Sequence, residues 1–253
     1  MILRIDDHGA VRVLTMNRPT ARNALSTELF EALHAALLEA DREDTVGAVV
    51  LIGADPAFCA GVDLKEAQQL GREYFRRFSR HDCMAAIADL RTPVIGAING
   101  ATFTGGLEIA LACDFLIASQ RAVFADTHAR VGILPGGGMT ARLPQVVGAA
   151  MARRLSMTGE VVDAARAERI GLVTEVVAHE QLLPRSVELA AQIAEVPSPI
   201  MTGLLEMYRR GSEAVTGPAL AAERQISAAT PMDTGELAAR QREVARRNKR
   251  QMS

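Results

Sequence analysis

Short, wholly apolar runs recur through the first half of the chain, which is typical of strands that are covered on both faces. The clearest run spans residues 47–53, where no polar side chain occurs. Glycine, proline or clustered polar residues bound the runs and mark the turns between them. The sequence therefore predicts strands at residues 11–16, 47–53, 93–98, 114–118 and 122–125.

Helical periodicity separates these strands and dominates the C-terminal third of the chain. Ser26 can cap the start of a helix that runs to about Ala40, because the leucines at 29, 33 and 37 then share one face. Strands and helices follow one another without a linker, a low-complexity tract or a repeat of fixed period, which favours one α/β domain with an all-helical C-terminal part. Further helical stretches are expected at residues 64–90 and 107–112, and from 143 onward with a break near 171–177.

The segment 105–112, Gly-Gly-Leu-Glu-Ile-Ala-Leu-Ala, carries the first candidate chemistry. Glycines just before a helix leave backbone N–H groups unobstructed at the end where anions bind. Glu108 lies three residues after Gly105, so both are on one face of the first turn. A carboxylate beside such a donor can move a proton on and off a carbon next to a carbonyl. An ordinary acidic first turn of a helix is the alternative.

A second segment, residues 56–65, supplies a second possible donor. Gly61 allows the chain to turn tightly, so the N–H of Val62 can face into a pocket. Two backbone donors can then share one oxyanion, and one donor of this kind is typically worth about 3–4 kcal/mol in a transition state. The Gly136–Gly138 run does not fit a phosphate-binding loop, because no Gly-Lys-Ser/Thr follows it; we expect it to lie close to an acyl group.

Composition narrows the classes of partner. A formal net charge of −2 excludes the electrostatic footprint of a nucleic-acid binder. The apolar runs are far shorter than the ~20 residues of a membrane span, and acids at positions 6 and 7 do not suit a secretory signal. We therefore expect no membrane partner and a cytoplasmic location. Two lysines among 28 basic residues suggest a GC-rich bacterial source.

Cysteine and histidine usage gives no sign of a metal site. Cys59, Cys83 and Cys113 are odd in number and widely spaced, so we expect three small buried side chains rather than a disulfide or zinc framework. The four histidines other than His128 do not cluster along the sequence. We expect no bound metal.

Several stretches together resemble the crotonase superfamily, the enoyl-CoA hydratase/isomerase family. The resemblance runs in register from about residue 3 to 185. It implies an α/β fold, a crotonase-like ββα spiral, with a core over residues 1–195 and a C-terminal helical extension over 196–253 that serves trimerisation or covers the ligand. The matching stretches are 17–25, 57–65, 93–100 and 105–114, with shorter matches at 132–138, 158–160 and 171–173.

The resemblance also implies roles for individual residues. The thioester carbonyl of an acyl-CoA would sit between the amides of Val62 and Gly105. Glu108 would correspond to the first of two glutamates that hydratases place around the attacking water. No cofactor is implied beyond the coenzyme A that the substrate carries, and the assembly expected is a homotrimer or a dimer of trimers. Positions that would contact the substrate or its coenzyme A are Ala21, Arg22, Ala60, Gly61, Asp63 and Lys65.

His128 stands where the family has its second glutamate, and Gly132 and Pro135 follow it without a gap. An imidazole can still hold a water or exchange a proton at neutral pH. If the segment is a strand, Asp126 falls on the same face and can orient the ring or raise its pKa. A structural histidine bonded to backbone is the alternative.

The main hypothesis is an enoyl-CoA hydratase of fatty acid metabolism that works through a stabilised thioester enolate. Two alternatives stay open, namely an enoyl-CoA isomerase that uses Glu108 alone and an acyl-CoA-binding protein with little turnover. Other reactions of the family, such as C–C cleavage or thioester hydrolysis, rank after them. The basic stretch 240–250 is expected to be a solvated helix end. Its alternative role is to supply charge to an anionic ligand.

Overall fold

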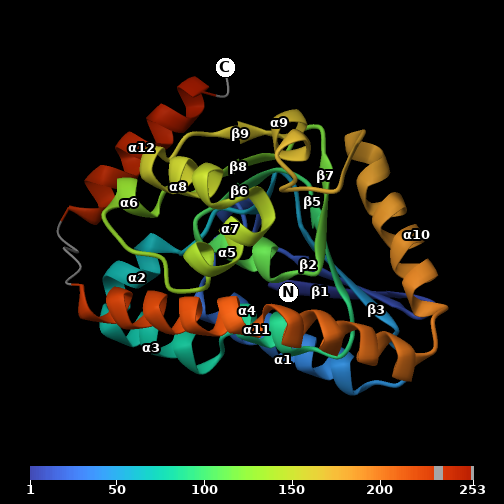
Figure 1. Ribbon diagram of the computed structural model, residues 1–253. Helices are drawn as coiled ribbons and strands as arrows, with labels where there is room; N and C mark the ends of the chain where they lie inside the picture. The colour runs from blue at the N-terminus through green and yellow to red at the C-terminus, as the bar shows by residue number, and fades with distance from the viewer. Residues whose placement is uncertain (231–235, 252–253) are drawn as a thin grey trace.

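Two β-sheets form the centre of the computed structural model, which describes residues 1–230 and 236–251 (Figure 1). The larger sheet has the strand order β1-β2-β3-β5-β7-β10, and the smaller has the order β4-β6-β8-β9. The pairs β3–β4, β5–β6 and β7–β8 each place one strand in either sheet before the chain turns into helices, which confirms the ββα spiral. The bounds are β1 Leu3–His8, β2 Val11–Met16, β3 Ala48–Gly53, β4 Ala57–Cys59, β5 Val94–Ile98, β6 Ala101–Phe103, β7 Phe115–Ser119, β8 Val123–Ala125, β9 Val162–Asp163 and β10 Glu175–Val177.

The apolar run at β3 is buried on both faces, as its composition predicts. Ala48 and Val50 pack on the side covered by helix α10 (Leu182–Ala194), while Val49 and Leu51 join the main core on the other side. Alternate residues of a strand point to opposite faces, so a strand between two apolar layers needs no polar position.

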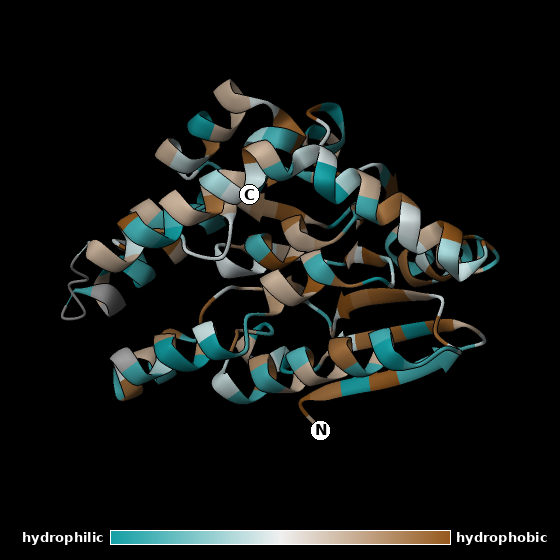
Figure 2. Cartoon of the chain, turned by 60° about the horizontal axis from the view of Figure 1, so that its bottom comes forward, coloured by the Kyte–Doolittle hydropathy of each residue, from teal (hydrophilic) through white to brown (hydrophobic). Residues whose placement is uncertain are grey.

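Helix α1 (Thr27–Arg42) confirms the expected amphipathic helix. The hydroxyl of Ser26 accepts a hydrogen bond from the Leu29 amide at 3.2 Å, so Ser26 is the N-cap. The three leucines at 29, 33 and 37 are fully buried. In Figure 2 the helices at the periphery carry mixed hydrophilic and hydrophobic residues, whereas the interior strands are mostly hydrophobic.

The remaining helices depart from the sequence prediction in their bounds. The expected stretch 64–90 is three helices, because Gly71 turns with a positive φ of 56° and Asp82 caps a new start. Helices α2 to α9 are Leu64–Leu70, Arg72–Arg80, Cys83–Asp89, Gly105–Ala112, His128–Val131, Met139–Val147, Ala149–Thr158 and Ala164–Arg169, with 3₁₀ turns at Pro19–Ala21 and His179–Gln181.

Five strands were not expected from the sequence, namely β1, β4, β6, β9 and the three-residue β10. In β1 only Leu3 is buried, and the alternation of apolar and polar residues ends at Asp6. The strands β4 and β6 have three residues each and lie in segments that read as loops, and β9 has two. Elements this short hold too few residues for a period to be detected.

The C-terminal part is helical, as expected. The long helix α11 (Ser198–Ala229) lies beside α7, and α12 (Leu237–Gln251) packs against α6 (Figure 1). The division into a core over 1–195 and an extension over 196–253 stays a prediction, and residues 231–235 and 252–253 of that extension lie outside the described residues. None of the described helices is long and apolar enough to cross a membrane.

Candidate active site

Three neighbouring strands of the smaller sheet end at one edge and deliver the candidate residues there. β4, β6 and β8 pair in parallel, so their carboxyl ends meet at the same edge. Val62 follows β4, Gly105 follows β6, and His128 follows β8. Parallel pairing therefore brings together segments that are far apart in the sequence, in the manner of other sites at strand carboxyl ends.

The two candidate oxyanion donors are close to each other. A Cβ built on Gly105 would lie 3.7 Å from the Val62 nitrogen. Neither amide donates a hydrogen bond within residues 1–230 and 236–251. Gly105 is the first residue of α5, where backbone N–H groups have no partner inside the helix. Both N–H groups are therefore free to bind one oxygen of a ligand.

The turns that present these amides leave no room for larger residues. Gly61 has a φ of +92°, and a Cβ there would lie 1.9 Å from the Thr104 hydroxyl. Thr104 itself has a φ of 48° and a ψ of −118°, an uncommon conformation that costs a residue other than glycine about 1–3 kcal/mol. Strain of this kind is typical of sites where backbone geometry serves a ligand.

Tyr74 fixes the segment that carries Val62, and sequence reasoning missed it. Its hydroxyl donates to the carbonyl of Leu25 and accepts from the Asp63 amide at 3.2 Å. The ring is fully buried, and burial raises the pKa of its hydroxyl well above the usual range. Tyr74 comes from α3, and only the folded chain brings it to residue 25, so no local pattern could have identified it.

Glu108 lies on the buried face of α5, with 4% of its surface exposed. Its Oε1 accepts hydrogen bonds from the Gly137 amide at 2.8 Å and from the Met139 amide at 3.3 Å. The Gly137 amide belongs to the Gly136–Gly138 run and Met139 follows it directly, so this run contacts the carboxylate. The expected contact of this run with an acyl group stays a prediction.

The imidazole of His128 faces Glu108 directly. Its Nε2 lies 3.7 Å from Oε2 of Glu108, and its Nδ1 lies 2.8 Å from Oδ1 of Asp126. Asp126 also accepts from the His128 amide at 3.2 Å. The strand β8 ends at Ala125, so Asp126 and His128 do not lie on one strand. The turn between β8 and α6 brings the two side chains together instead. The ring nitrogen Nδ1 is therefore bonded to a side chain and not to backbone, while the choice between a catalytic and a structural role for His128 stays a prediction.

The surroundings raise the pKa of both members of the pair. Burial raises the pKa of Glu108, although the positive charge of His128 opposes this. Burial lowers the pKa of His128, but the negative charge of Glu108 and the hydrogen bond to Asp126 outweigh it, so the net direction is upward. The raised pKa of His128 favours its imidazolium form, and the raised pKa of Glu108 favours its protonated form.

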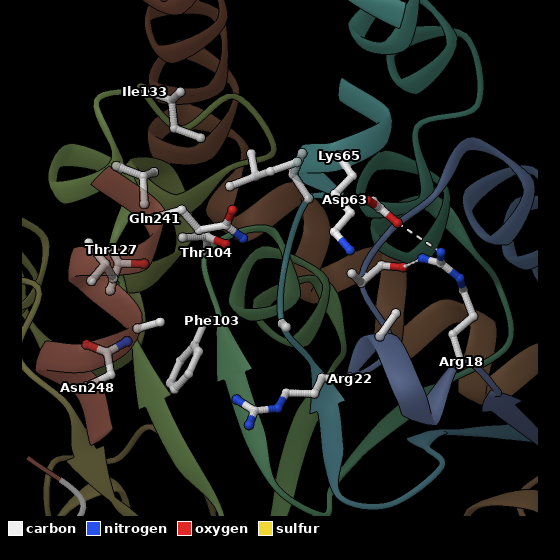
Figure 3. A pocket seen from close by; sticks show the side chains of 18 of the residues that line it. Arg18, Arg22, Asp63, Lys65, Phe103, Thr104, Thr127, Ile133, Gln241 and Asn248 are labelled. Carbon is white, nitrogen blue, oxygen red and sulfur yellow. Dashed lines mark hydrogen bonds and ion pairs between the residues drawn. The ribbon is translucent and has the colours of Figure 1, made fainter. Parts of the chain in front are cut away.

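A cleft of about 910 Å³ opens beside the segments that carry Asp63 and Thr104 (Figure 3). It is lined by Val62 and Thr104 and by Thr127, the neighbour of His128. Gly61, Gly105, Glu108 and His128 are buried and do not line it. The other residues predicted to contact substrate do line it, namely Ala21, Arg22, Ala60, Asp63 and Lys65.

Positive charge surrounds the open part of the cleft. Arg18 pairs with Asp63 at 2.8 Å, while the side chains of Arg22 and Lys65 are exposed (Figure 3). Helix α12 adds Arg246 and Lys249 from the opposite side. The basic C-terminal stretch, expected to be a solvated helix end, thus lies on the cleft, and a phosphorylated ligand would be attracted there.

Among residues 1–230 and 236–251, no group of three or more His, Cys, Asp or Glu side chains is placed to hold a metal ion. The three cysteines are free and buried, as expected.

The chain is similar to known proteins both in sequence and in structure. Residues 6–242 match the family described as enoyl-CoA hydratase/isomerase. A protein of Rhizobium meliloti strain 1021 named probable enoyl-CoA hydratase is 39% identical, over 88% of this chain and 87% of its own. The crystal structure of enoyl-CoA hydratase from Mycobacterium tuberculosis H37Rv is 49% identical, with a TM-score of 0.80, over 90% of this chain and 96% of that one.

The chain is also similar to a protein that is named an isomerase and not a hydratase. The structure of a monofunctional enoyl-CoA isomerase from Mycobacterium smegmatis superposes with a TM-score of 0.74 at 29% identity. The superposition covers 87% of this chain and 98% of that one.

Proposed function

This chain belongs to the enoyl-CoA hydratase/isomerase family, and from that premise we propose that it adds water across the double bond of a 2-enoyl-CoA in fatty acid metabolism. The observation that carries the proposal is the facing pair Glu108 and His128, two buried groups that can transfer protons, together with the two free backbone amides. Hydration needs a base for the water and an acid for the α-carbon, and this pair provides one of each.

The proposed reaction begins with polarisation of the thioester. The amides of Val62 and Gly105 bind the carbonyl oxygen, where negative charge develops as the β-carbon is attacked. The carboxylate of Glu108 takes a proton from the water, whose oxygen forms the new bond to the β-carbon. The electron pair of the double bond moves onto the thioester as an enolate.

His128 completes the addition as the acid. The imidazolium gives its Nε2 proton to the α-carbon, the enolate collapses to the thioester, and a 3-hydroxyacyl-CoA results. Glu108 is then protonated and His128 neutral, so one proton must return from Oε2 to Nε2. The 3.7 Å gap is too long for a direct hydrogen bond, but a small side-chain movement would close it. No resident cofactor is required, because coenzyme A arrives with the substrate.

Coenzyme A is proposed to occupy the basic cleft. The support is the arrangement of Arg22, Lys65, Arg246 and Lys249 around its opening, which suits the phosphates of the nucleotide end. The thioester end would then reach Val62 and Thr104 at the base of the cleft.

Enoyl-CoA isomerisation is the second candidate. It is favoured by the histidine that replaces the second glutamate and by the similar isomerase structure from Mycobacterium smegmatis. A single carboxylate, Glu108, could carry one proton between two carbons of the acyl chain.

The two functions are separated by substrate. Purified protein should hydrate crotonyl-CoA, which is seen as loss of the conjugated enoyl-thioester absorbance. Conversion of a 3-enoyl-CoA to the 2-enoyl form without hydration of crotonyl-CoA would favour the isomerase. Binding of both compounds with no change in either would support the acyl-CoA-binding alternative and contradict both reactions.

We also propose a trimer or a dimer of trimers, as expected from the family. In support, α11 exposes large apolar side chains at a spacing that keeps several of them on one side of the helix. An exposed apolar stripe of this kind suits contact with another subunit. Its members are Ile200, Leu204, Met207, Tyr208, Val215 and Ile226.

A further inference from the structure

Glu223 is a buried carboxylate that the proposed reaction does not use. It lies on α11, with 6% of its surface exposed. Its Oε1 accepts from the Gly138 amide at 2.6 Å, and its Oε2 accepts from the Thr140 amide at 2.6 Å and from the Thr140 hydroxyl. All three donors belong to the start of α7. Burial of a carboxylate is costly unless it is hydrogen-bonded in this way.

The start of α7 is held by two carboxylates that bind alternate amides. Glu108 accepts from the amides of Gly137 and Met139, while Glu223 accepts from those of Gly138 and Thr140. Gly138 is the N-cap and has no side chain with which to cap the helix. Glu223 supplies that cap from another helix, and the same four-residue segment binds the catalytic carboxylate on its other side.

The segment has little freedom to shift between the two carboxylates. Arg142 donates to the carbonyl of Gly137 at 2.7 Å. A Cβ on Gly137 would lie 2.9 Å from Oε2 of Glu108, and one on Gly138 would lie 1.9 Å from Nη1 of Arg142. A change at Glu223 is therefore transmitted through the backbone to the two amides that hold Glu108.

We propose that Glu223 is a positioning residue for the proton-transfer pair, which fixes the segment 137–140 so that its amides hold the Glu108 carboxylate toward His128. The proposal rests on the proposed hydration, since it assigns Glu223 a part in that reaction. It also gives α11 a place in the site, although Glu223 does not line the cleft.

The charge of Glu223 acts on the same pair. Burial is the main cause of the raised pKa of Glu108, and the negative charge of Glu223 raises it further. That charge also helps to raise the pKa of His128, although it contributes less than Glu108 and Asp126 do. The other charged groups around the segment are Arg142 on α7, Asp82 at the start of α4 and Arg224 on α11. Removal of the Glu223 charge should therefore lower both pKa values.

The test compares Glu223→Gln with Glu213→Gln, the same exchange at an exposed position of α11. Glutamine keeps the size of Glu223 but loses its charge and one acceptor. We expect kcat for crotonyl-CoA to fall about 10- to 100-fold with KM within about twofold, because the pair is misplaced while the cleft is intact. Both limbs of the pH–rate profile should move to lower pH. Glu213→Gln should match the wild type.

Two measurements do not depend on turnover. Amide hydrogen exchange at Gly137 and Met139 should be about tenfold faster or more in Glu223→Gln, with exchange in the large sheet unchanged. Titration of the His128 imidazole by ¹⁵N NMR, with its signal identified through a His128→Gln variant, should give a lower pKa in the same protein.

An unchanged pH–rate profile, exchange rate and His128 titration in folded Glu223→Gln would overturn the proposal. A uniform loss of protection over the whole chain would also overturn it, because Glu223 would then serve only general stability. If wild-type protein binds crotonyl-CoA without hydrating it, the proposed function fails, and the exchange and titration still decide whether Glu223 positions the pair.

Discussion

At the residue scale, proton transfer depends on His128 and on the side chains that face its two ring nitrogens. Asp126 accepts from Nδ1, which leaves Nε2 toward Glu108. Replacement of His128 by Gln keeps a polar side chain of similar size but removes the transferable proton. We expect kcat to fall about 10²-fold with binding of acyl-CoA retained, as measured by turnover of crotonyl-CoA and by calorimetry. His128→Gln with wild-type turnover would show that the imidazole serves structure only.

The pH dependence follows from the same three side chains. Turnover needs Glu108 as a carboxylate and His128 as an imidazolium, so activity rises with pH through the pKa of Glu108 and falls through that of His128. Asp126→Asn removes the negative charge that helps to raise the pKa of His128. The falling limb of the pH–rate profile should move to lower pH, and the rising limb should move much less. A falling limb that stays in place would mean that it does not report His128.

The candidate site was partly predictable from single residues. The spacing of Gly105 and Glu108 indicated an anion-binding helix start with a carboxylate, and the resemblance to the family added His128. Tyr74 and Glu223 were not predictable. Glu223 binds residues 83 and 85 positions earlier in the chain, and such pairings leave no local pattern. Each is an ordinary residue of an amphipathic helix until the fold supplies its partners.

At the scale of elements, predictions succeeded where a helix or strand was long and one-sided. The buried run of β3 and the leucine face of α1 were recognised because each repeats its period several times. The three-residue strands β4 and β6 were missed, although they lead directly to the two amides proposed to bind the oxyanion. Local pattern therefore located the core better than the small sheet on which the site is built.

Helix α12 lines one side of the cleft, and its contribution to ligand binding can be tested. Val244 lies on it, is 8% exposed, and packs with Leu64, Val131 and Ile133. Val244→Asp would bury an unpaired charge among apolar side chains, which costs several kcal/mol, so α12 should leave the cleft. We expect KM for acyl-CoA to rise about tenfold, since the contacts of Arg246 and Lys249 are lost with it.

Ala239→Asp is the matched control, because Ala239 is exposed on the same helix and does not line the cleft. It should leave KM unchanged. If Val244→Asp also leaves KM unchanged while the melting temperature shows a folded protein, α12 does not contribute to binding.

At the scale of the whole molecule, the exposed apolar stripe on α11 predicts an assembly. Met207 and Tyr208 are 74% and 73% exposed, more than large apolar side chains usually are in a lone subunit. The double variant Met207→Glu/Tyr208→Glu should dissociate the oligomer to monomers, as measured by light scattering after size-exclusion chromatography. Arg210→Gln, a change of an exposed polar residue nearby, should keep the wild-type mass. A monomeric wild type would contradict the assembly.

The overall architecture could be predicted further than its details. Alternating strands and helices indicated an α/β fold. The assignment of consecutive strands to two different sheets came from the resemblance, because local sequence does not determine which distant strands pair. The cytoplasmic location and the bacterial source stay predictions from composition.

The most direct measurement of the central claim follows the oxygen that is added. Wild-type protein, incubated with crotonyl-CoA in H₂¹⁸O, should form 3-hydroxybutyryl-CoA that carries the heavy oxygen, as read by mass spectrometry. Glu108→Gln should bind the substrate but form less labelled product by about 10²- to 10⁴-fold, because the base for the water is lost. Wild-type protein that binds crotonyl-CoA and forms no labelled product, or Glu108→Gln that forms it at the wild-type rate, would contradict the account.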